Sequence, residues 1–586
     1  MSLRLLIQTI FLTVIAATAG CGGGGSGGGA GGGSATAPGA GATTGSTDPA
    51  PVPPPDAVVH PTQLAASRFI GQATFGPTMQ QITQLASSDY NSWINAEFAK
   101  PATLRRTYID QAQAALPAGT TVSQNQFFEA FWQQAVRGDD QLRQRVAFAL
   151  SQIFVVSLQD SGVAQYPRGV ASFYDMLAAD AFGNYRTLLE DVSLHPMMGM
   201  YLTSLHNAKE SANRTPDENY AREVMQLMSI GLNKLNPDGT LVLVAGKPVE
   251  TYTTGDITGM AKVFTGWSWA GPDKTTTRFN GGTPDANRDW TPMQAYPQFH
   301  SSSQKDFLGV TIPAQSSADP QASLKVALDT LFNHPNVGPF IGRQLIQRLV
   351  TSNPSPQYIG RVAAAFANNG AGVRGDMKAV IKAVLLDPEA RNDNVQATPR
   401  SGKLREPVIR LAHWMRSFNA TSTSRQFLIH NTDDALSGLA QTPMRSPSVF
   451  NFYRPGYVPA NTTLAAAGLV APEMQITAET STTGYLNLMR DVVPNGTGTN
   501  RDVKPDYTAE LALTDTPDAL VERVNLLLTA GQMSSGLKAK IVGAINSVAI
   551  PAATANNAAT IDTARKNRVY LAVFLTLASP EYIAQK

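Results

Sequence analysis

Apolar and polar residues recur at helical spacing along most of this 586-residue chain, and the pattern is sharpest over residues 215–231. At about 100° per residue, one arc of this stretch is apolar. Its members are Tyr220, Ala221, Val224, Met225, Leu227 and Met228. The opposite arc, with Ile230 as its one apolar member, carries Glu218, Asn219, Arg222, Glu223, Gln226 and Ser229. The pattern predicts an amphipathic helix around which the fold is organised.

Both ends of this helix are marked in the sequence. Thr215 and Glu218 have the spacing of a capping box, and Pro216 occupies the first helical position, where its missing N–H is harmless. Gly231 is placed to end the helix in a left-handed conformation. We therefore predict that the helix spans 215–231.

The polar arc has two interpretations. It can be a solvated face with a Glu218–Arg222 pair, worth a few tenths of a kcal/mol. It can instead line a cleft, because it combines two carboxylates, a guanidinium and two amides without any lysine. In a cleft, Glu218 or Glu223 would act as general acid or base, while Arg222 and Asn219 would bind the substrate. Because the opposite arc must itself be buried, we expect the polar arc to face the interior or a cleft.

A second predicted helix, over 139–155, carries an arginine on its apolar face. Arg143 falls between Leu150 and Phe154 there. A buried arginine needs a carboxylate partner, for which Glu218 and Glu223 are the natural candidates. The alternative is that its guanidinium extends to solvent.

Most of the remaining chain is also predicted to be helical. A turn sequence at 236–239, followed by the stretches 241–244 and 249–252, predicts a small hairpin in this part of the chain. The proline-rich stretch 441–459 suits a rigid loop that crosses a surface or lines a cleft. Further helices are expected over 173–181, 185–194, 196–205, 322–332, 337–349, 357–367, 377–386, 405–418, 474–488, 517–527, 536–545 and 567–578. The predicted fold class is mainly α: a large multi-helix globular domain with a small β-hairpin and long ordered loops.

The N-terminal residues have the character of an export leader. An apolar run ends in Thr18-Ala19-Gly20-Cys21, which resembles a bacterial lipobox. We expect 1–20 to be a lipoprotein signal peptide and Cys21 to be lipidated after cleavage. The alternative is an ordinary secretory signal cut near Ala19 or Gly20.

The composition then changes twice along the chain. Residues 21–57 are rich in Gly, Ser and Pro and predict a flexible tether. Residues 58–586 are expected to form a single large helical domain, for which two lobes, about 58–315 and 316–586, are considered. No later stretch of about 18 apolar residues could cross a bilayer, so attachment to the membrane would depend on the lipid.

Composition excludes some classes of protein. Charged residues make up only 15% and the formal net charge is +2, without a polybasic run, which excludes a nucleic-acid binder that works through a basic surface. Cys21 is the single cysteine, so neither an intramolecular disulfide nor a cysteine metal cluster can form.

A metal or general-base role is left to seven histidines. His300, followed by Lys305, has the most functional setting because it lies in a predicted loop. A zinc or iron site built from His195, His206, His300 and Glu218 is conceivable, although their spacing matches no metal motif. His195 precedes a proline at a helix start and is also explained as a cap. The cofactor therefore stays open, with a divalent metal as one candidate.

Polar groups also lie beside proline breaks in the second half of the chain. Residues 403–407, which include Arg405, and Glu473 are of this kind, a setting typical of cleft residues or of capped helix ends. Arg405 and Asn451, which lies in the 441–459 loop, are therefore further binding candidates.

Several phrases, in this order along the chain, resemble the bacterial family called domain of unknown function 1800. They include Arg68-Phe69, Asp217-Glu218-Asn219-Tyr220-Ala221-Arg222-Glu223, Phe264-Thr265-Gly266-Trp267, His334-Pro335 and Pro447-Ser448-Val449-Phe450-Asn451-Phe452. The resemblance implies a large, mainly helical, exported bacterial protein, often encoded beside a sulfatase-like partner, and it implies no established reaction. Where the family usually has His-Asp before the lysine, this chain has His300-Ser301, which weakens a metal or acid-base role for that pair.

Two functional hypotheses follow. The first is an envelope-anchored enzyme or accessory subunit, acting on an extracellular polymer or with the sulfatase-like partner. Its catalytic candidates are Glu218, Glu223 and His300, and its binding candidates are Asn219, Arg222, Lys305, Arg405 and Asn451. The second is a non-catalytic scaffold in which the polar helix is purely structural.

Overall fold

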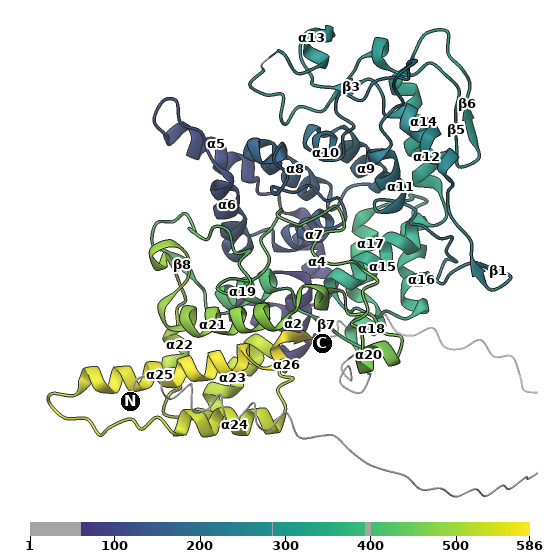
Figure 1. Ribbon diagram of the computed structural model, residues 1–586. Helices are drawn as coiled ribbons and strands as arrows, with labels where there is room; N and C mark the ends of the chain where they lie inside the picture. Colours follow the sequence, from purple (N-terminus) through teal and green to yellow (C-terminus); the bar gives the residue numbers. More distant parts are fainter. Residues whose placement is uncertain (1–59, 284, 393–399) are drawn as a thin grey trace, which may run out of the picture.

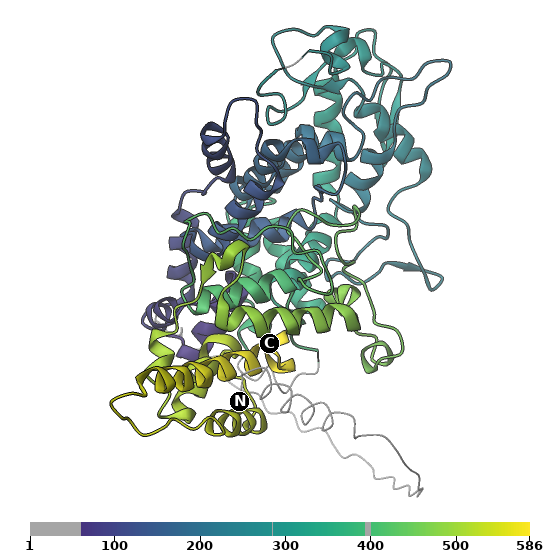
Figure 2. The ribbon, with the colours of Figure 1, turned by 60° about the vertical axis from the view of Figure 1, so that its left-hand side comes forward.

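The computed structural model describes residues 60–283, 285–392 and 400–586, and it is mainly α-helical as predicted (Figure 1). Within these residues, the strands form five two-stranded antiparallel sheets. The molecule is elongated, with the C-terminal helices at one end and the segment around β3 at the other (Figure 2). None of the described helices is long and apolar enough to cross a membrane. The predicted signal peptide, Cys21 and the tether lie outside the described residues.

Polar caps begin most of the N-terminal helices. Thr78 forms a capping box with Gln81 at α3, and Ser123 forms one with Gln126 at α6. The α7 helix lies inside the predicted 139–155. The elements are α2 (Gln63–Ala73), α3 (Met79–Ala86), α4 (Tyr90–Ala99), α5 (Arg105–Ala115), α6 (Gln124–Arg137), α7 (Gln141–Ser151), η1 (Val163–Gln165) and α8 (Pro167–Asp180).

The next segment contains the predicted hairpin, with a shifted turn. The strands β1 (Leu243–Val244) and β2 (Lys247–Pro248) pair across Ala245 and Gly246, whose φ angles of 51° and 76° suit the two-residue turns that match strand twist. The predicted turn at 236–239 does form, but it closes a separate loop through the Leu235–Leu241 bridge. The helices here are α9 (Tyr185–Leu194), which has the predicted bounds, α10 (Pro196–Tyr201), α11 (Asn219–Gln226) and α12 (Thr254–Val263).

A loop region with short strands follows α12, as expected. Phe279, Tyr296 and Phe299 pack together at its centre. Its elements are β3 (Trp267–Ser268), α13 (Thr276–Phe279), β4 (Gln294–Ala295), η2 (Pro297–Phe299), β5 (Lys305–Phe307) and β6 (Val310–Ile312).

Regular helices then resume. Helices α15 and α17 have the predicted bounds, and Asp376 caps α17 through two backbone N–H groups. The elements are α14 (Pro320–Asn333), α15 (Val337–Leu349), α16 (Pro356–Ala367), α17 (Met377–Leu386), α18 (Pro388–Arg391), β7 (Lys403–Leu404) and α19 (Pro407–Ser417).

The C-terminal segment returns to the start of the described chain. Strand β10 (Ala584–Gln585) pairs with β7, and α23 (Pro517–Thr529) contacts α2 (Figure 1). One hydrophobic core runs from Ala66 to Tyr582. The division into lobes near residue 315 stays a prediction. The other elements are β8 (Thr421–Ser422), α20 (Thr463–Ala466), η4 (Pro472–Ile476), α21 (Glu479–Asn495), η5 (Thr499–Arg501), β9 (Val503–Lys504), α22 (Thr508–Leu511), α24 (Ser535–Asn546), α25 (Ala558–Leu577) and α26 (Pro580–Ile583).

Candidate functional site

Helix α11 is shorter than the sequence predicts, because Asp217 takes the role expected of Thr215. The Asp217 carboxylate accepts hydrogen bonds from the Asn219 N–H at 2.8 Å and from the Thr203 hydroxyl at 2.9 Å. The helix therefore begins at Asn219, and the Thr215–Glu218 capping box does not form. Residues 215–218 are non-helical.

The helix also ends early, at Gln226, so the predicted end at Gly231 is wrong. Gly231 does adopt the left-handed conformation, with a φ of 72°, and its N–H donates to the Met225 carbonyl at 3.0 Å. The glycine is also needed for space. A Cβ at this position would lie 2.7 Å from the Phe340 ring on α15. Gly231 therefore allows α15 to approach the end of α11 closely.

The outer part of the polar arc is a surface ion pair. Arg222 and Glu218 are 3.4 Å apart, with side chains 43% and 35% exposed, and the Thr258 hydroxyl donates to the same carboxylate at 2.8 Å. Asn219 is exposed as well. The expectation that these three residues face the interior or a cleft is wrong, because they remain half-buried or exposed, with Thr258 on α12 and Thr203 as hydrogen-bond partners. Such a pair contributes roughly 0.3–0.5 kcal/mol.

The inner part of the arc behaves differently. Glu223 is 7% exposed, and its Oε2 has no hydrogen-bond partner in the described part of the chain. Burial raises the pKa of this carboxyl, and the nearby Arg222 charge opposes the shift. One turn later, the Gln226 side chain accepts a hydrogen bond from the Tyr252 hydroxyl at 3.3 Å and lines a cavity.

This cavity, which we call the central cavity, has a volume of about 480 Å³. It lies where the C-terminal ends of α7 and α11 meet α15 and the loop 449–455. Its volume and its mainly apolar wall are typical of small-ligand sites. The apolar wall consists of Ile153, Leu227, Leu232, Phe340, Val449, Phe450 and Pro455, and the polar groups are Gln152, Gln226, Gln344, Arg348 and Arg454.

Behind Gln152 lies a buried carboxylate. The Gln152 amide donates to Glu406, which is fully buried at the start of α19, and the Gln441 amide donates to the same oxygen at 2.8 Å. The Tyr453 hydroxyl donates to the side-chain amide oxygen of Gln152 at 3.4 Å. Gln152 therefore links the cavity wall to a carboxylate that does not itself line the cavity.

Lys403 and Glu473 form a buried ion pair in the same region. Their side chains are 2% and 1% exposed and 2.8 Å apart, and the Lys403 ammonium also donates to the Arg348 carbonyl at 3.0 Å. Burial raises the pKa of Glu473, while the Lys403 charge opposes this shift. We call Arg145, Arg348, Lys403, Glu406 and Glu473 the ionic cluster.

The ionic cluster contains three cations and two carboxylates. Arg348 belongs both to it and to the cavity wall, and donates to the backbone carbonyls of Gln344 and Gln152 at 3.2 and 3.0 Å. Its Nε and the Gln344 amide nitrogen have no hydrogen-bond partner in the described residues. The cavity is therefore backed by a surplus of buried donors and positive charge.

The predicted pairing of Arg143 with Glu218 or Glu223 is wrong. Its guanidinium donates instead to the backbone carbonyls of Ala178 at 3.0 Å and Lys100 at 3.1 Å, and it lies over the Phe182 ring. Arg143 is 9% exposed, so it does not extend into solvent either. Carbonyl groups at helix ends accept from both terminal nitrogens of this arginine, while its Nε has no partner in the described residues.

His300 is fully buried with both ring nitrogens engaged. Its Nδ1 donates to the Thr265 carbonyl at 2.8 Å, and its Nε2 accepts from the Ser323 hydroxyl at 3.0 Å. Burial lowers the pKa of His300 to about 4, so the ring is neutral at pH 7. With both nitrogens occupied, this histidine is a structural residue in the state described.

Lys305 is also fully buried, and its ammonium has only long contacts, 3.3 Å to the Ser303 carbonyl and 3.5 Å to Gln315. Burial lowers the pKa of Lys305 to about 8, and the Glu210 carboxylate opposes the shift. Ser301, which takes the place of the family aspartate, donates to Glu210 at 2.8 Å. In the described residues, no hydrogen bond or ion pair joins this group to the α11 arc.

The remaining histidine candidates are separated from one another. The His195 ring accepts from the Met197 N–H at 3.2 Å and so caps α10, and burial lowers its pKa to about 3. The His206 ring packs against Trp269 and Phe279. Within the described ranges, no three His, Cys, Asp or Glu side chains are grouped so that they could hold a metal ion.

The last two binding candidates shape the fold near the cavity. Arg405 donates to the Tyr582 carbonyl and lies 4.8 Å from that ring, so it holds the C-terminal segment. Asn451 adopts a φ of 63°, which asparagine tolerates, inside the loop whose neighbouring residues line the central cavity. The prediction that the 441–459 loop lines a cleft is thereby confirmed.

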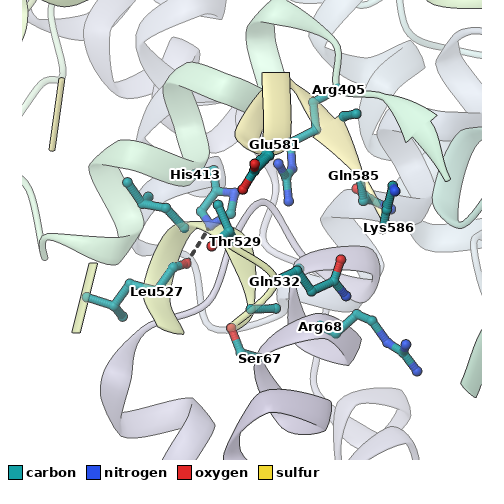
Figure 3. A pocket seen from close by; sticks show the side chains of 14 residues that line it. Ser67, Arg68, Arg405, His413, Leu527, Thr529, Gln532, Glu581, Gln585 and Lys586 are labelled. Atoms are coloured by element: carbon teal, nitrogen blue, oxygen red, sulfur yellow. Dashed lines mark hydrogen bonds between the residues drawn. The ribbon is translucent and has the colours of Figure 1, made fainter. Parts of the chain in front are cut away.

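A second, polar crevice lies beside Arg405 where α2, α23 and the C-terminus meet (Figure 3). There the His413 ring donates to the Leu527 carbonyl at 2.9 Å. The crevice holds only about 10 Å³, roughly the space of one water molecule. It is therefore too small for a substrate.

The central cavity was not predicted as a whole, because its walls come from four distant segments. A signal for Arg348 does exist: like Arg143, it interrupts the buried face of a helix, one turn after Gln344. Glu406 and Glu473 were recognised as polar groups beside prolines, but their burial and partners depend on tertiary structure.

Comparisons with known proteins identify the family of this chain but assign no activity to it. No curated protein and no solved structure matches it. The sequence model of a family described as "Protein of unknown function (DUF1800)" matches residues 68–584, nearly the whole chain. The protein therefore belongs to the DUF1800 family.

Proposed function

We propose that this protein is an exported envelope lipoprotein, anchored through Cys21, that binds an anionic extracellular polysaccharide in the central cavity. The cavity is the observation that carries the proposal, because aromatic, amide and guanidinium groups meet in one hollow of about 480 Å³. The reaction itself would belong to a sulfatase-like partner, to which this protein would present the polymer.

The chemistry of the wall suits a sugar chain. The Phe340 and Phe450 rings offer apolar faces for a sugar ring, and three glutamine amides can both donate to and accept from hydroxyl groups. Arg454 lies over the Phe450 ring at 4.5 Å with its side chain exposed at the cavity edge. Guanidinium groups pair with carboxylate or sulfate-like oxygens in two-pronged geometry, which suits an anionic substituent.

Binding fits the cavity better than hydrolysis does. None of the described residues that line it is an Asp, Glu or His, the usual general acids and bases. The carboxylate that is hydrogen-bonded to the cavity wall, Glu406, is fully buried behind Gln152. The accessory form of the first hypothesis is thus better supported than the enzyme form.

The test is affinity electrophoresis and calorimetry of the purified chain from residue 22 onward, which lacks Cys21, against carboxylated, sulfated and neutral polysaccharides. We expect binding to an anionic polymer that falls about tenfold in Phe450→Ala, because one stacking face is lost. Arg454→Ala should weaken it several-fold and reduce its salt dependence.

Arg222→Ala is the matched control, because it removes an exposed guanidinium from the outer arc of α11. It should bind like the parent chain. If Arg222→Ala loses binding while Phe450→Ala and Arg454→Ala keep it, the ligand binds at the polar arc of α11 and not in the central cavity. Absence of binding to every polymer would refute the proposed ligand class.

A further inference from the structure

Arg105 is a fully buried arginine whose side chain makes no hydrogen bond. It is the first residue of α5, and helices α6 and α8 pack against α5 (Figure 1). Its exposure is 0%, and Nε, Nη1 and Nη2 all lack an acceptor in the described part of the chain. A guanidinium carries five N–H donors, so the missing acceptors leave an unusually large demand for hydrogen bonds.

Aromatic rings satisfy only part of this demand. The Arg105 guanidinium carbon lies 3.9 Å from the centre of the Tyr174 ring and 5.6 Å from that of Phe131. A ring face attracts the positive charge. It does not accept the N–H groups that point outward in the guanidinium plane. The contact therefore explains the position of the side chain and leaves its donors available.

The carboxylate in this region is already engaged. Both oxygens of Asp175 accept backbone N–H groups at the start of α5, from Arg105 and Arg106, each at 2.8 Å. No described carboxylate lies within 4 Å of the Arg105 side chain. Asp175 thus serves as the cap of α5 and opposes the arginine charge only from a distance.

Two further donors near this point also lack partners. The Tyr174 hydroxyl is fully buried and has no hydrogen bond in the described residues, and the same holds for Nε and Nη1 of Arg145, which is 2% exposed. Both guanidinium groups act electrostatically on Tyr174, lowering a pKa that burial raises. Tyr174 therefore lies against the Arg105 guanidinium, and the charge of Arg145 also acts on it.

We infer that a small monovalent anion of the chloride type binds to the unpartnered donors of Arg105 and Tyr174. The guanidinium groups of Arg105 and Arg145 and the Asp175 carboxylate together leave one positive charge in excess. The rest of the ionic cluster adds two cations, Arg348 and Lys403, and two carboxylates, Glu406 and Glu473. The enlarged set of four cations and three carboxylates therefore again has one positive charge in excess. A buried unpaired charge is strongly unfavourable, and a single negative charge with no directional bonding requirement corrects it.

Thermal unfolding and bromide diffraction test this site in the chain from residue 22 onward, which lacks Cys21. We expect the Tm to rise by about 2–4 °C when sodium gluconate is replaced by sodium chloride or bromide at equal ionic strength, because an ion that binds only the folded state stabilises it. Crystals grown in bromide should show an anomalous peak between Arg105 and Tyr174.

Tyr174→Phe removes one proposed ligand and should reduce the halide-dependent rise in Tm. Tyr485→Phe is the matched control, because the buried Tyr485 hydroxyl already donates to the Leu577 carbonyl at 3.1 Å. It should leave the rise unchanged. Equal Tm values in all salts, a site filled by water without an anomalous peak, or the same halide response in Tyr174→Phe would each overturn the inference.

Discussion

The Lys403 ammonium lies 2.8 Å from the Glu473 carboxylate, and both side chains are closed off from solvent. Lys403 belongs to β7, which pairs with the C-terminal strand β10, and Glu473 belongs to η4. This single contact therefore joins the end of the chain to the segment that follows the cavity loop, immediately behind the wall formed by Arg348.

Breaking this pair from one side should be costly. Lys403→Met leaves the Glu473 carboxylate buried without its cation, and the free energy of unfolding should fall by about 3–5 kcal/mol. The double variant Lys403→Met with Glu473→Leu should recover a large part of the loss, because no charge is stranded. Urea denaturation of the three variants measures this. If the losses of the two single variants simply add up in the double variant, the pairing is contradicted.

Arg143 should be coupled to carbonyl groups and not to the α11 carboxylates. Arg143→Leu removes donors from the Ala178 and Lys100 carbonyls and should lower the free energy of unfolding by about 2–4 kcal/mol. Glu218→Leu, at a surface pair, should change it by less than about 0.5 kcal/mol. A double-mutant cycle between Arg143 and Glu223 should give a coupling energy near zero, and a coupling above about 1 kcal/mol would restore the rejected pairing.

Gly231→Ala should affect the cavity as well as stability. The added methyl group would lie 2.7 Å from the Phe340 ring, at a φ of 72°. We expect a loss of about 2 kcal/mol and weaker ligand binding, because Phe340 must move. Gly246→Ala is the control, since its φ is 76° and no atom lies within 4 Å of the new Cβ. Gly246→Ala should lose only the stability that a positive φ costs a residue other than glycine. Identical losses of stability in the two variants would mean that contact with Phe340 is unimportant.

Glu223 should make stability depend on pH. Its pKa is raised above the usual 4.5 by burial, so the folded state holds this proton more tightly than the unfolded chain does. Its contribution to stability is then fully present below about pH 4.5 and is lost as the pH rises through the folded-state pKa. Glu223→Gln should therefore be more stable than the parent at pH 7, with a smaller difference at pH 4. Greater stability of the parent at pH 7 would indicate an unseen partner for the carboxylate.

Cys21→Ser should release the protein from membranes or leave it as an uncleaved precursor, because the thiol is the proposed point of lipid attachment. Fractionation of cells that express the full chain, followed by immunoblotting, measures both effects. Normal maturation with unchanged membrane association would contradict the lipoprotein assignment.

Helices with a strong periodic pattern and a clear cap could be predicted closely. Residues 185–194, 337–349 and 377–386 are helical to the residue. The start of α11 could not, because Asp217 competes with Thr215 through contacts to a distant loop. The partners of Arg143 are backbone carbonyls, which any residue type supplies, so no residue pattern marks them.

The candidate site shows the same limit. The 441–459 loop was predicted to line a cleft from its composition, and Val449, Phe450, Arg454 and Pro455 do so. The polar arc of α11 is predicted to face the interior or a cleft, yet only Gln226 of that arc lines the cavity. The rest of the cavity depends on how α7, α11 and α15 meet, which is a property of packing.

The most direct test of the central claim is a crystal structure of the chain from residue 22 onward in complex with an oligosaccharide fragment of the anionic polymer it binds most tightly. We predict a sugar ring against Phe450 or Phe340, hydrogen bonds to the glutamine amides and an anionic substituent at Arg348 or Arg454. A fragment bound to Arg222 and Glu218 on the outer face of α11, with the central cavity empty, would contradict the account.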